Sequence, residues 1–149
     1  MARLRLRVTL GDPRAQNLLG SWYSRGEIVE FDPCEAARLW GLAAAQGDAH
    51  AQNNLACMYR KGQGVTRDAH EAARLWLLAA DQGINVAMYS LVFYYREVLI
   101  DPESAQRWLR TAAQHGHIKA QREWVKQYES DTKAGAVRCH IMTALPQLS

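Results

Sequence analysis

The sequence is poor in cysteine, in long apolar runs and in net charge, and each shortage narrows the possible functions. Its three cysteines (Cys34, Cys57 and Cys139) are irregularly spaced and lack a Cys-x-x-Cys pair, so they predict neither a disulfide framework nor a zinc knuckle. No apolar run approaches the roughly 18 residues of a transmembrane helix. The net charge of +3 is spread along the chain and is too weak to indicate a nucleic-acid partner.

A recognisable export signal is also missing from the first residues. The basic start, residues 1–7, is followed by only three apolar residues, whereas an export signal has an apolar core of about 7–15 residues. A chain of 149 residues with 48% hydrophobic content corresponds to one ordinary domain. We therefore expect a soluble, monomeric protein without a membrane partner, cytoplasmic by default; a longer native N-terminus would allow the periplasm or secretion.

An internal repeat is the strongest signal in the sequence. The run GDPRAQNLLG at 11–20 returns as GDAHAQNNLA at 47–56, and AARLW at 36–40 returns at 72–76, in both cases after 36 residues. The predicted units are an N-terminal arm or degenerate helix (1–10), three repeats (11–46, 47–82 and 83–115), the first helix of a partial fourth repeat (116–129) and a C-terminal cap or tail (130–149).

Each unit has the periodicity of two helices. Ala15, Leu19 and Tyr23 share one face of a 3.6-residue period in the first half of a unit, and Ala36 and Trp40 do so in the second half. Because two helices cannot bury their apolar stripe alone, we expect an all-α fold in which hairpins stack into a right-handed α/α superhelix of the tetratricopeptide kind. Helix starts and stops are predicted at Asp12-Pro13, Asp32-Pro33, Asp68 and Asp101-Pro102, and at glycines 26, 47, 62, 83 and 116.

Residue detail points to a family. Residues 49–83 carry the pattern Ala-x-Ala-Gln-x-x-Leu-Ala-x-Met-Tyr-x-x-Gly-x-Gly-Val-x-x-Asp-x-x-x-Ala-Ala-x-x-Trp-x-x-Ala-Ala-x-Gln-Gly, which closely resembles the Sel-1-like repeat. The resemblance covers residues 11–82 almost completely and 83–129 more loosely, because the third unit has Val98-Leu99-Ile100 in place of the Gly-x-Gly-Val loop. It implies the same stacked-helix fold and a role in binding other proteins.

Residues that suggest chemistry have simpler explanations. Gly62-Gln63-Gly64 follows a helix rather than a strand and lacks a third glycine, so we interpret it as a turn and not as a phosphate loop. Cys57 and His50 are roughly 10 Å apart along one helix, too far for a nucleophile and its base. We therefore predict no catalytic residue, no metal and no cofactor. A metal site remains a minor alternative, with His115, His117, Cys139 and His140 as its ligands.

The repeat also separates interior positions from a candidate surface. Trp40, Trp76, Tyr23, Tyr59 and Tyr95 recur at equivalent places, which predicts that they fill the interior between units. In this type of solenoid the first helices line the concave side, so their remaining face is the expected ligand surface. The predicted partner-binding residues on it are Asn17, Ser21, Asn53, Cys57, Arg60, Tyr89, Phe93, Arg96, Arg122 and Lys126.

Two aromatic residues distinguish the third unit. Tyr89 and Phe93 stand one helical turn apart where the first two units carry small polar residues, which predicts an aromatic ridge flanked by Arg60, Arg96 and Arg122. Aromatic and arginine side chains are the commonest binding hot spots. The alternative is that Tyr89 and Phe93 pack under the C-terminal tail, whose apolar residues at 137–148 need cover.

The expected function is that of a non-enzymatic module that holds another protein, or an extended peptide with acidic and apolar anchors, in its concave groove. The resemblance implies an adaptor, assembly scaffold or regulator, including immunity proteins that neutralise a bacterial toxin. The competing class is the cysteine-rich relatives linked to β-lactam binding or hydrolysis. This sequence lacks their cysteine pairs and has no Ser-x-x-Lys motif, so we predict that it is not an enzyme.

Overall fold

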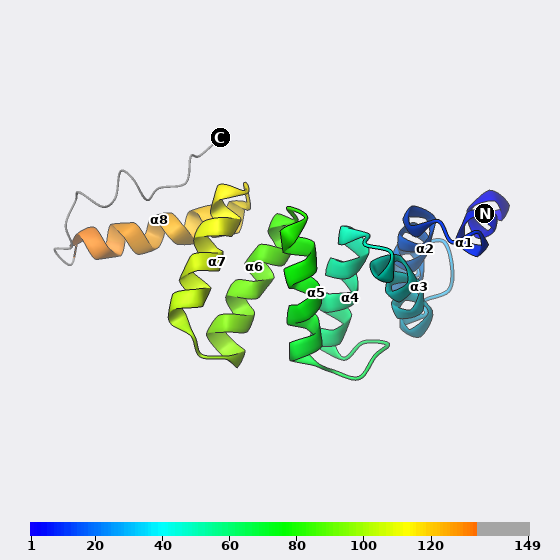
Figure 1. Cartoon of the computed structure of the whole chain (residues 1–149), viewed down its shortest axis with the longest axis horizontal. Coiled ribbons are helices and arrows are strands. Elements are labelled where there is room, and N and C mark those ends of the chain that lie inside the picture. The colour runs from blue at the N-terminus through cyan, green and yellow to red at the C-terminus, as the bar shows by residue number, and fades with distance from the viewer. Residues whose placement is uncertain (134–149) are drawn as a thin grey trace. The chain divides into compact units, whose positions relative to one another are not determined.

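The computed structural model describes residues 1–133, and throughout that range the chain is a succession of helices with no strand (Figure 1). The predicted all-α helical repeat is thereby confirmed. Residues 134–149, which make up most of the predicted cap or tail, lie outside the described residues. The elements are α1 (Ala2–Thr9), α2 (Pro13–Arg25), α3 (Pro33–Ala45), α4 (Ala49–Lys61), α5 (Ala69–Asp81), α6 (Asn85–Phe93), the π-helix η1 (Tyr94–Val98), α7 (Pro102–Gln114) and α8 (Ile118–Lys133).

The chain divides into two compact units, residues 1–84 and 85–149. In the first unit α2 pairs with α3 and α4 with α5, and α3 also packs against α4, so two helical hairpins stack. In the second unit α6 pairs with α7, and α7 packs against α8. Within the part of the chain that the structure describes, no helix is both long and apolar enough to cross a membrane.

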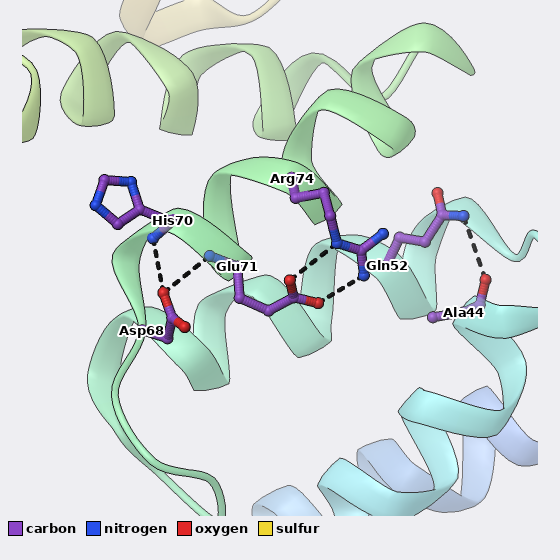
Figure 2. A network of polar contacts seen from close by, with 6 residues as sticks. All are labelled: Ala44, Gln52, Asp68, His70, Glu71 and Arg74. Atoms are coloured by element: carbon purple, nitrogen blue, oxygen red, sulfur yellow. Dashed lines mark hydrogen bonds and ion pairs between the residues drawn. The ribbon is translucent and has the colours of Figure 1, made fainter.

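Aspartates begin most of these helices, as the sequence predicts. The carboxylates of Asp12, Asp32, Asp68 and Asp101 accept hydrogen bonds from backbone N–H groups of the first turn of α2, α3, α5 and α7. Figure 2 shows Asp68 accepting from the N–H groups of His70 and Glu71, both at 3.0 Å. Because each cap satisfies N–H groups that would otherwise have no helical partner, helix starts follow from local sequence.

The interior of the first unit combines alanines with two tryptophans. Trp40 and Trp76 are 6% and 1% exposed, and the alanines of α3 and α5 beside them are buried, which allows the helices to approach closely. This confirms the interior position of the tryptophans. The sequence also predicts that Tyr23, Tyr59 and Tyr95 fill the interior. In the structure these three side chains are only half-buried.

These tyrosines have a different role, through the backbone. In each repeat the N–H of the aspartate that caps the second helix donates to the tyrosine carbonyl of the first helix, with N···O distances of 3.0, 2.9 and 2.8 Å for Asp32–Tyr23, Asp68–Tyr59 and Asp101–Tyr95. We call this contact the Tyr–Asp clamp. It fixes where the second helix starts relative to the first.

The third repeat keeps the clamp although its loop is three residues shorter. The first helix ends there in η1, where the Leu99 N–H bonds the Tyr94 carbonyl at 3.2 Å, and Ile100 takes a φ of +53°. Positive φ is rare for a β-branched residue because its Cβ crowds the backbone. The shorter connection is thus accommodated by a wider helical turn and one strained residue.

Buried glutamine side chains link successive helices. The Gln52 amide, 4% exposed, donates to the Ala44 carbonyl at the end of α3 at 3.3 Å (Figure 2), and its oxygen accepts from Gln82 at 2.9 Å. Gln121 makes the equivalent bond to the Ala113 carbonyl at 3.0 Å. These bonds satisfy buried polar groups between one hairpin and the next helix.

Candidate functional site

The predicted partner-binding residues lie on the first helices of the repeats, in two groups. One group belongs to the first unit and the other to the second, and each is described separately. The first group is Asn17, Ser21, Asn53, Cys57 and Arg60 on α2 and α4; the second is Tyr89, Phe93, Arg96, Arg122 and Lys126 on α6, η1 and α8.

Asn17 is part of the framework of the first unit. Its carbonyl accepts from the Trp40 indole Nε1 at 3.1 Å and from the Ser21 hydroxyl at 3.0 Å, and its side-chain oxygen accepts from Asn54 at 3.3 Å. Asn17 and Ser21 are half-buried. Asn17 therefore helps to hold α2 against α3 and α4, whereas the Ser21 hydrogen bond lies within α2.

Cys57 faces a small cavity in the first unit. The thiol forms no disulfide, and burial raises its pKa against the opposing effects of Arg60, Lys61 and the Trp76 side chain. A raised pKa leaves less of the thiol in the nucleophilic thiolate form at neutral pH. Its volume is about 190 Å³, and its walls are Ser24, Phe31, Pro33, Trp40, Asn54, Cys57, Met58, Lys61 and Gln63.

The other two predicted residues of this unit differ in exposure. Asn53 is half-buried, and its side-chain oxygen is buried without a hydrogen-bond partner. Arg60 is exposed in the last turn of α4. The structure brings Asn53 and Arg60 onto the same helix as Cys57 but does not gather them around one pocket.

In the second unit Tyr89 is the centre of a polar cluster. Its hydroxyl donates to a Glu123 carboxylate oxygen at 3.1 Å, and Arg96 donates to the other oxygen at 2.7 Å. The Tyr89 ring stacks on His117, with ring centroids 4.4 Å apart. Burial and the adjacent Glu123 carboxylate raise the pKa of Tyr89. Tyr89 is thus half-buried and not the open ridge residue that the sequence predicts.

Sequence reasoning missed Glu123, which the repeat register indicates only once the Asn17–Asn54 contact is known. Asn17 and Asn54, which bond each other in the first unit, occupy the same repeat positions as Tyr89 and Glu123. One pair of positions on neighbouring first helices is therefore bonded in both units. Superimposing the repeat register on these contacts identifies Glu123 as the partner of Tyr89.

His117 has a structural role of its own. Its Nδ1 accepts the Ala120 N–H at 3.2 Å, so the ring caps α8 where aspartates cap α2 and α4. Burial, with a smaller contribution from Lys119, lowers the pKa of His117. Among residues 1–133 no three His, Cys, Asp or Glu side chains are grouped to hold a metal ion. Cys139 and His140, the other two ligands of the metal alternative, lie outside the described residues.

The remaining residues of this group reach solvent. Phe93 is 47% exposed one turn after Tyr89, and Arg122 and Lys126 are exposed on α8. Of the three arginines expected beside the aromatic pair, the structure shows Arg96 in contact with the Tyr89 cluster through Glu123. The alternative in which residues 137–148 cover the aromatic pair lies outside the described residues.

Comparison with known proteins places these features in a family. The Sel1 repeat model matches residues 13–48, 49–84 and 86–117. A Sel1 repeat protein from Oxalobacter formigenes is 34% identical with a TM-score of 0.68, over 74% of this chain and 45% of that one. A protective antigen present in uropathogenic Escherichia coli strains, which displays an SLR fold, is 28% identical with a TM-score of 0.79, over 95% of this chain and 31% of that one.

The matched region covers less than half of either solved protein, and comparison with curated proteins gives no match. The family match itself extends over most of the chain and follows the helical hairpins described above. On this evidence the chain belongs to the Sel1 repeat family.

Proposed function

We propose that this chain is a non-enzymatic module that binds another protein, or an extended segment of one, through the first-helix face that carries Phe93. Sel1 repeat proteins generally mediate protein–protein interactions. The proposed role is that of an adaptor, assembly scaffold or regulator, and an immunity protein against a bacterial toxin is one form that such a regulator takes.

The observation that carries this proposal is a solvent-facing aromatic side chain on a rigid support. Phe93 is 47% exposed, and the preceding turn is held by the contacts of Tyr89 with His117 and Glu123. An anchor that projects from a preformed helical turn requires little backbone ordering on binding. Buried aromatic anchors commonly contribute roughly 2 kcal/mol or more to an interface.

The cations of the second unit indicate the chemistry of the partner. Arg96, Arg122 and Lys126 are exposed in the same unit, and of these three only Arg96 forms an ion pair among residues 1–133, with Glu123. Cations near an aromatic anchor favour a segment that carries both carboxylates and apolar side chains. The proposed partner is therefore an acidic protein segment with at least one apolar anchor.

The chemistry of the cysteines favours binding over catalysis. Cys34 and Cys57 are both unpaired, and burial raises the pKa of the Cys57 thiol. The cavity beside Cys57 therefore offers no activated nucleophile. The cytoplasmic location stays a prediction, which fractionation of cells that express the full-length gene product tests.

Affinity capture with matched variants tests the proposed function. The wild-type chain and a Phe93→Ala/Arg96→Glu variant are used as baits, and circular dichroism confirms that both are folded. The control is Ile118→Ala/Lys119→Glu, which removes an exposed apolar side chain and reverses one charge on α8 of the same unit. Both variants change the net charge by the same amount, so non-specific charge effects cancel.

We expect one protein to be captured by wild type and by the control but lost with the Phe93→Ala/Arg96→Glu variant. If all three baits return the same proteins, the binding surface lies elsewhere on the chain. If none of them returns a specific protein from any cell fraction, the adaptor role is wrong.

A further inference from the structure

A second surface of the second unit has the properties of a binding cleft. It lies between α7 and α8, has a volume of about 590 Å³ and is separate from the Phe93 surface. None of its residues is among those predicted from the sequence. Its walls are Pro102, Glu103, Gln106, Arg107, Arg110 and Trp124.

The cleft contains a buried donor without an acceptor. Trp124 is 5% exposed, and its indole Nε1 is buried and has no hydrogen-bond partner. Leaving a buried N–H unsatisfied costs about 1–3 kcal/mol. Trp40, by contrast, donates its indole N–H to the Asn17 carbonyl at 3.1 Å. Trp76, which lines neither cavity, also has an indole N–H without a partner, so the unsatisfied N–H of Trp124 does not by itself mark a ligand site.

The repeat register shows that α7 has lost an acidic side chain here. Arg107 occupies the position of Arg38 and Arg74, which form ion pairs with Glu35 and Glu71 three residues earlier, as Figure 2 shows for Glu71–Arg74. In α7 that earlier position is Ser104, and Arg107 donates to its hydroxyl at 3.0 Å instead of to a carboxylate.

A second cation adds to this charge. Arg110 stands where α3 and α5 have Gly41 and Leu77, so α7 carries two arginines on the wall of the cleft. Among residues 1–133 neither Arg107 nor Arg110 forms an ion pair, and the one acidic wall residue is Glu103. The cleft thus combines an aromatic wall with two arginines that form no ion pair among residues 1–133, although Arg107 lies close enough to the Asp101 carboxylate to interact with its charge.

The sequence after residue 133 offers no acidic side chain that could pair with Arg107 and Arg110. Residues 134–149 contain no Asp or Glu and include Arg138. Charge complementarity therefore favours an occupant from another protein over this chain's own last residues.

We propose that the α7–α8 cleft binds an acidic peptide segment of a partner protein. A carboxylate of the segment pairs with Arg107 and Arg110, and an apolar side chain packs beside the Trp124 wall of the cleft. This inference rests on the proposed protein-binding function and adds to it a second contact site with a defined acidic preference.

A library of random 12-residue peptides on phage, panned against the immobilised full-length chain, provides the probe. The selected peptides are expected to combine Asp or Glu with Leu, Phe or Trp. The strongest peptide is then synthesised and added to full-length chain labelled with ¹⁵N in its tryptophans, and the Trp124 indole resonance is assigned with Trp124→Phe. Binding is expected to shift this resonance.

The matched variants are Arg107→Gln/Arg110→Gln in the cleft and Arg38→Gln/Arg74→Gln at the equivalent positions of α3 and α5. We expect the cleft variant to bind the peptide at least about tenfold more weakly, which corresponds to about 1.4 kcal/mol, and the control to bind it like wild type. Replacing each peptide carboxylate by an amide is expected to weaken binding to the same extent.

Three results overturn the inference. The first is a selected peptide that leaves the Trp124 indole resonance unchanged, and the second is equal affinity of the cleft variant and wild type. The third is a shift of the Trp124 resonance on deletion of residues 134–149 without peptide, because this chain's own C-terminus then covers the cleft. Loss of partner capture with Phe93→Ala/Arg96→Glu tests the proposed function independently, so the two failures are distinguishable.

Discussion

At the scale of single residues, Ile100 shows how a backbone constraint overrides side-chain preference. Its φ of +53° places a β-branched residue in the left-handed region, and its side chain is 79% exposed, so no burial compensates. The Tyr–Asp clamp of the third repeat holds this conformation, because the connection between Tyr95 and Asp101 is too short for a relaxed path.

We therefore predict that Ile100→Gly stabilises the chain by about 0.5–1 kcal/mol, since the relief of left-handed strain exceeds the entropy that glycine adds to the unfolded chain. Urea unfolding followed by circular dichroism measures the difference. Leu99→Gly is the control, because Leu99 has a φ of −91° and should lose stability on the same change. A destabilised Ile100→Gly variant would show that the residue is not strained.

A second residue-scale prediction compares two aromatic side chains. Trp76 is 1% exposed, so Trp76→Ala should cost about 3–5 kcal/mol as a large-to-small change in the interior. Tyr89 is half-buried, and Tyr89→Ala should cost about 1–2 kcal/mol, because it loses a ring stack and one hydrogen bond at the surface. Equal losses in urea melts would contradict the assignment of Tyr89 to the surface cluster.

At the scale of elements, helix starts were predictable and the ending of α6 in η1 was not. An aspartate cap accepts hydrogen bonds from N–H groups two or three residues away. The helix starts at Asp32 and Asp68 can therefore be predicted from the neighbouring residues alone. The π-helix η1 arises because a three-residue shortening coexists with the clamp between Tyr95 and Asp101, a contact that local sequence does not display.

The cap of α8 predicts a pH dependence. The Nδ1 of His117 accepts a hydrogen bond, and burial lowers its pKa in the folded chain, so the unfolded chain binds the proton more readily. This contribution to stability is complete above the ordinary histidine pKa of about 6.5 and is lost as pH falls below it. His117→Asn keeps a capping side chain but cannot titrate.

Urea midpoints at several pH values between 7.5 and 5 measure this effect. Wild type should lose more stability than His117→Asn over this interval, whatever the difference between the two at pH 7.5. If the urea midpoints of wild type and His117→Asn change with pH in parallel, the protonation of His117 does not affect stability.

Two glycines, Gly64 in the loop of the second repeat and Gly41 inside α3, are predicted to respond in opposite directions to substitution by alanine. A Cβ on Gly64 would lie 2.2 Å from the Pro33 carbonyl oxygen, and its φ is +70°. Gly64→Ala should therefore cost about 1–3 kcal/mol, because backbone must move on both sides. Gly41, inside α3, has open space at its Cβ, and Gly41→Ala should gain about 0.5–1 kcal/mol. Thermal melts of both variants test the contrast.

At the scale of the whole molecule, the sequence predicted the architecture because the same pattern recurs after 36 residues, and repetition separates signal from chance. The candidate site was predicted less well. Glu123 and Trp124 acquire their roles from contacts with α6 and α7 that depend on where the helices pack. The exchange of Glu71 for Ser104 is visible in the sequence, but its meaning depends on the ion pairs of the other repeats.

The surplus of cations predicts salt-sensitive binding. The chain has a net charge of +3, and the proposed contacts of the second unit use exposed Arg96, Arg107 and Arg110. Because the screening length falls from about 10 Å at 0.1 M salt to about 3 Å at 1 M, affinity for an acidic partner should fall by about tenfold over this range. Calorimetry with the captured partner measures it, and an unchanged Kd would exclude an electrostatic interface.

Because of the Tyr–Asp clamp, the two helices of a hairpin keep the same alignment whatever the length of the segment that connects them. The same N–H···O contact closes connections of different length, with Asp68–Tyr59 at 2.9 Å and Asp101–Tyr95 at 2.8 Å. Insertions and deletions can therefore accumulate between these anchor points during evolution without shifting the register of the hairpin. For a protein engineer, the same segments are natural places to graft a foreign epitope while the scaffold keeps its geometry.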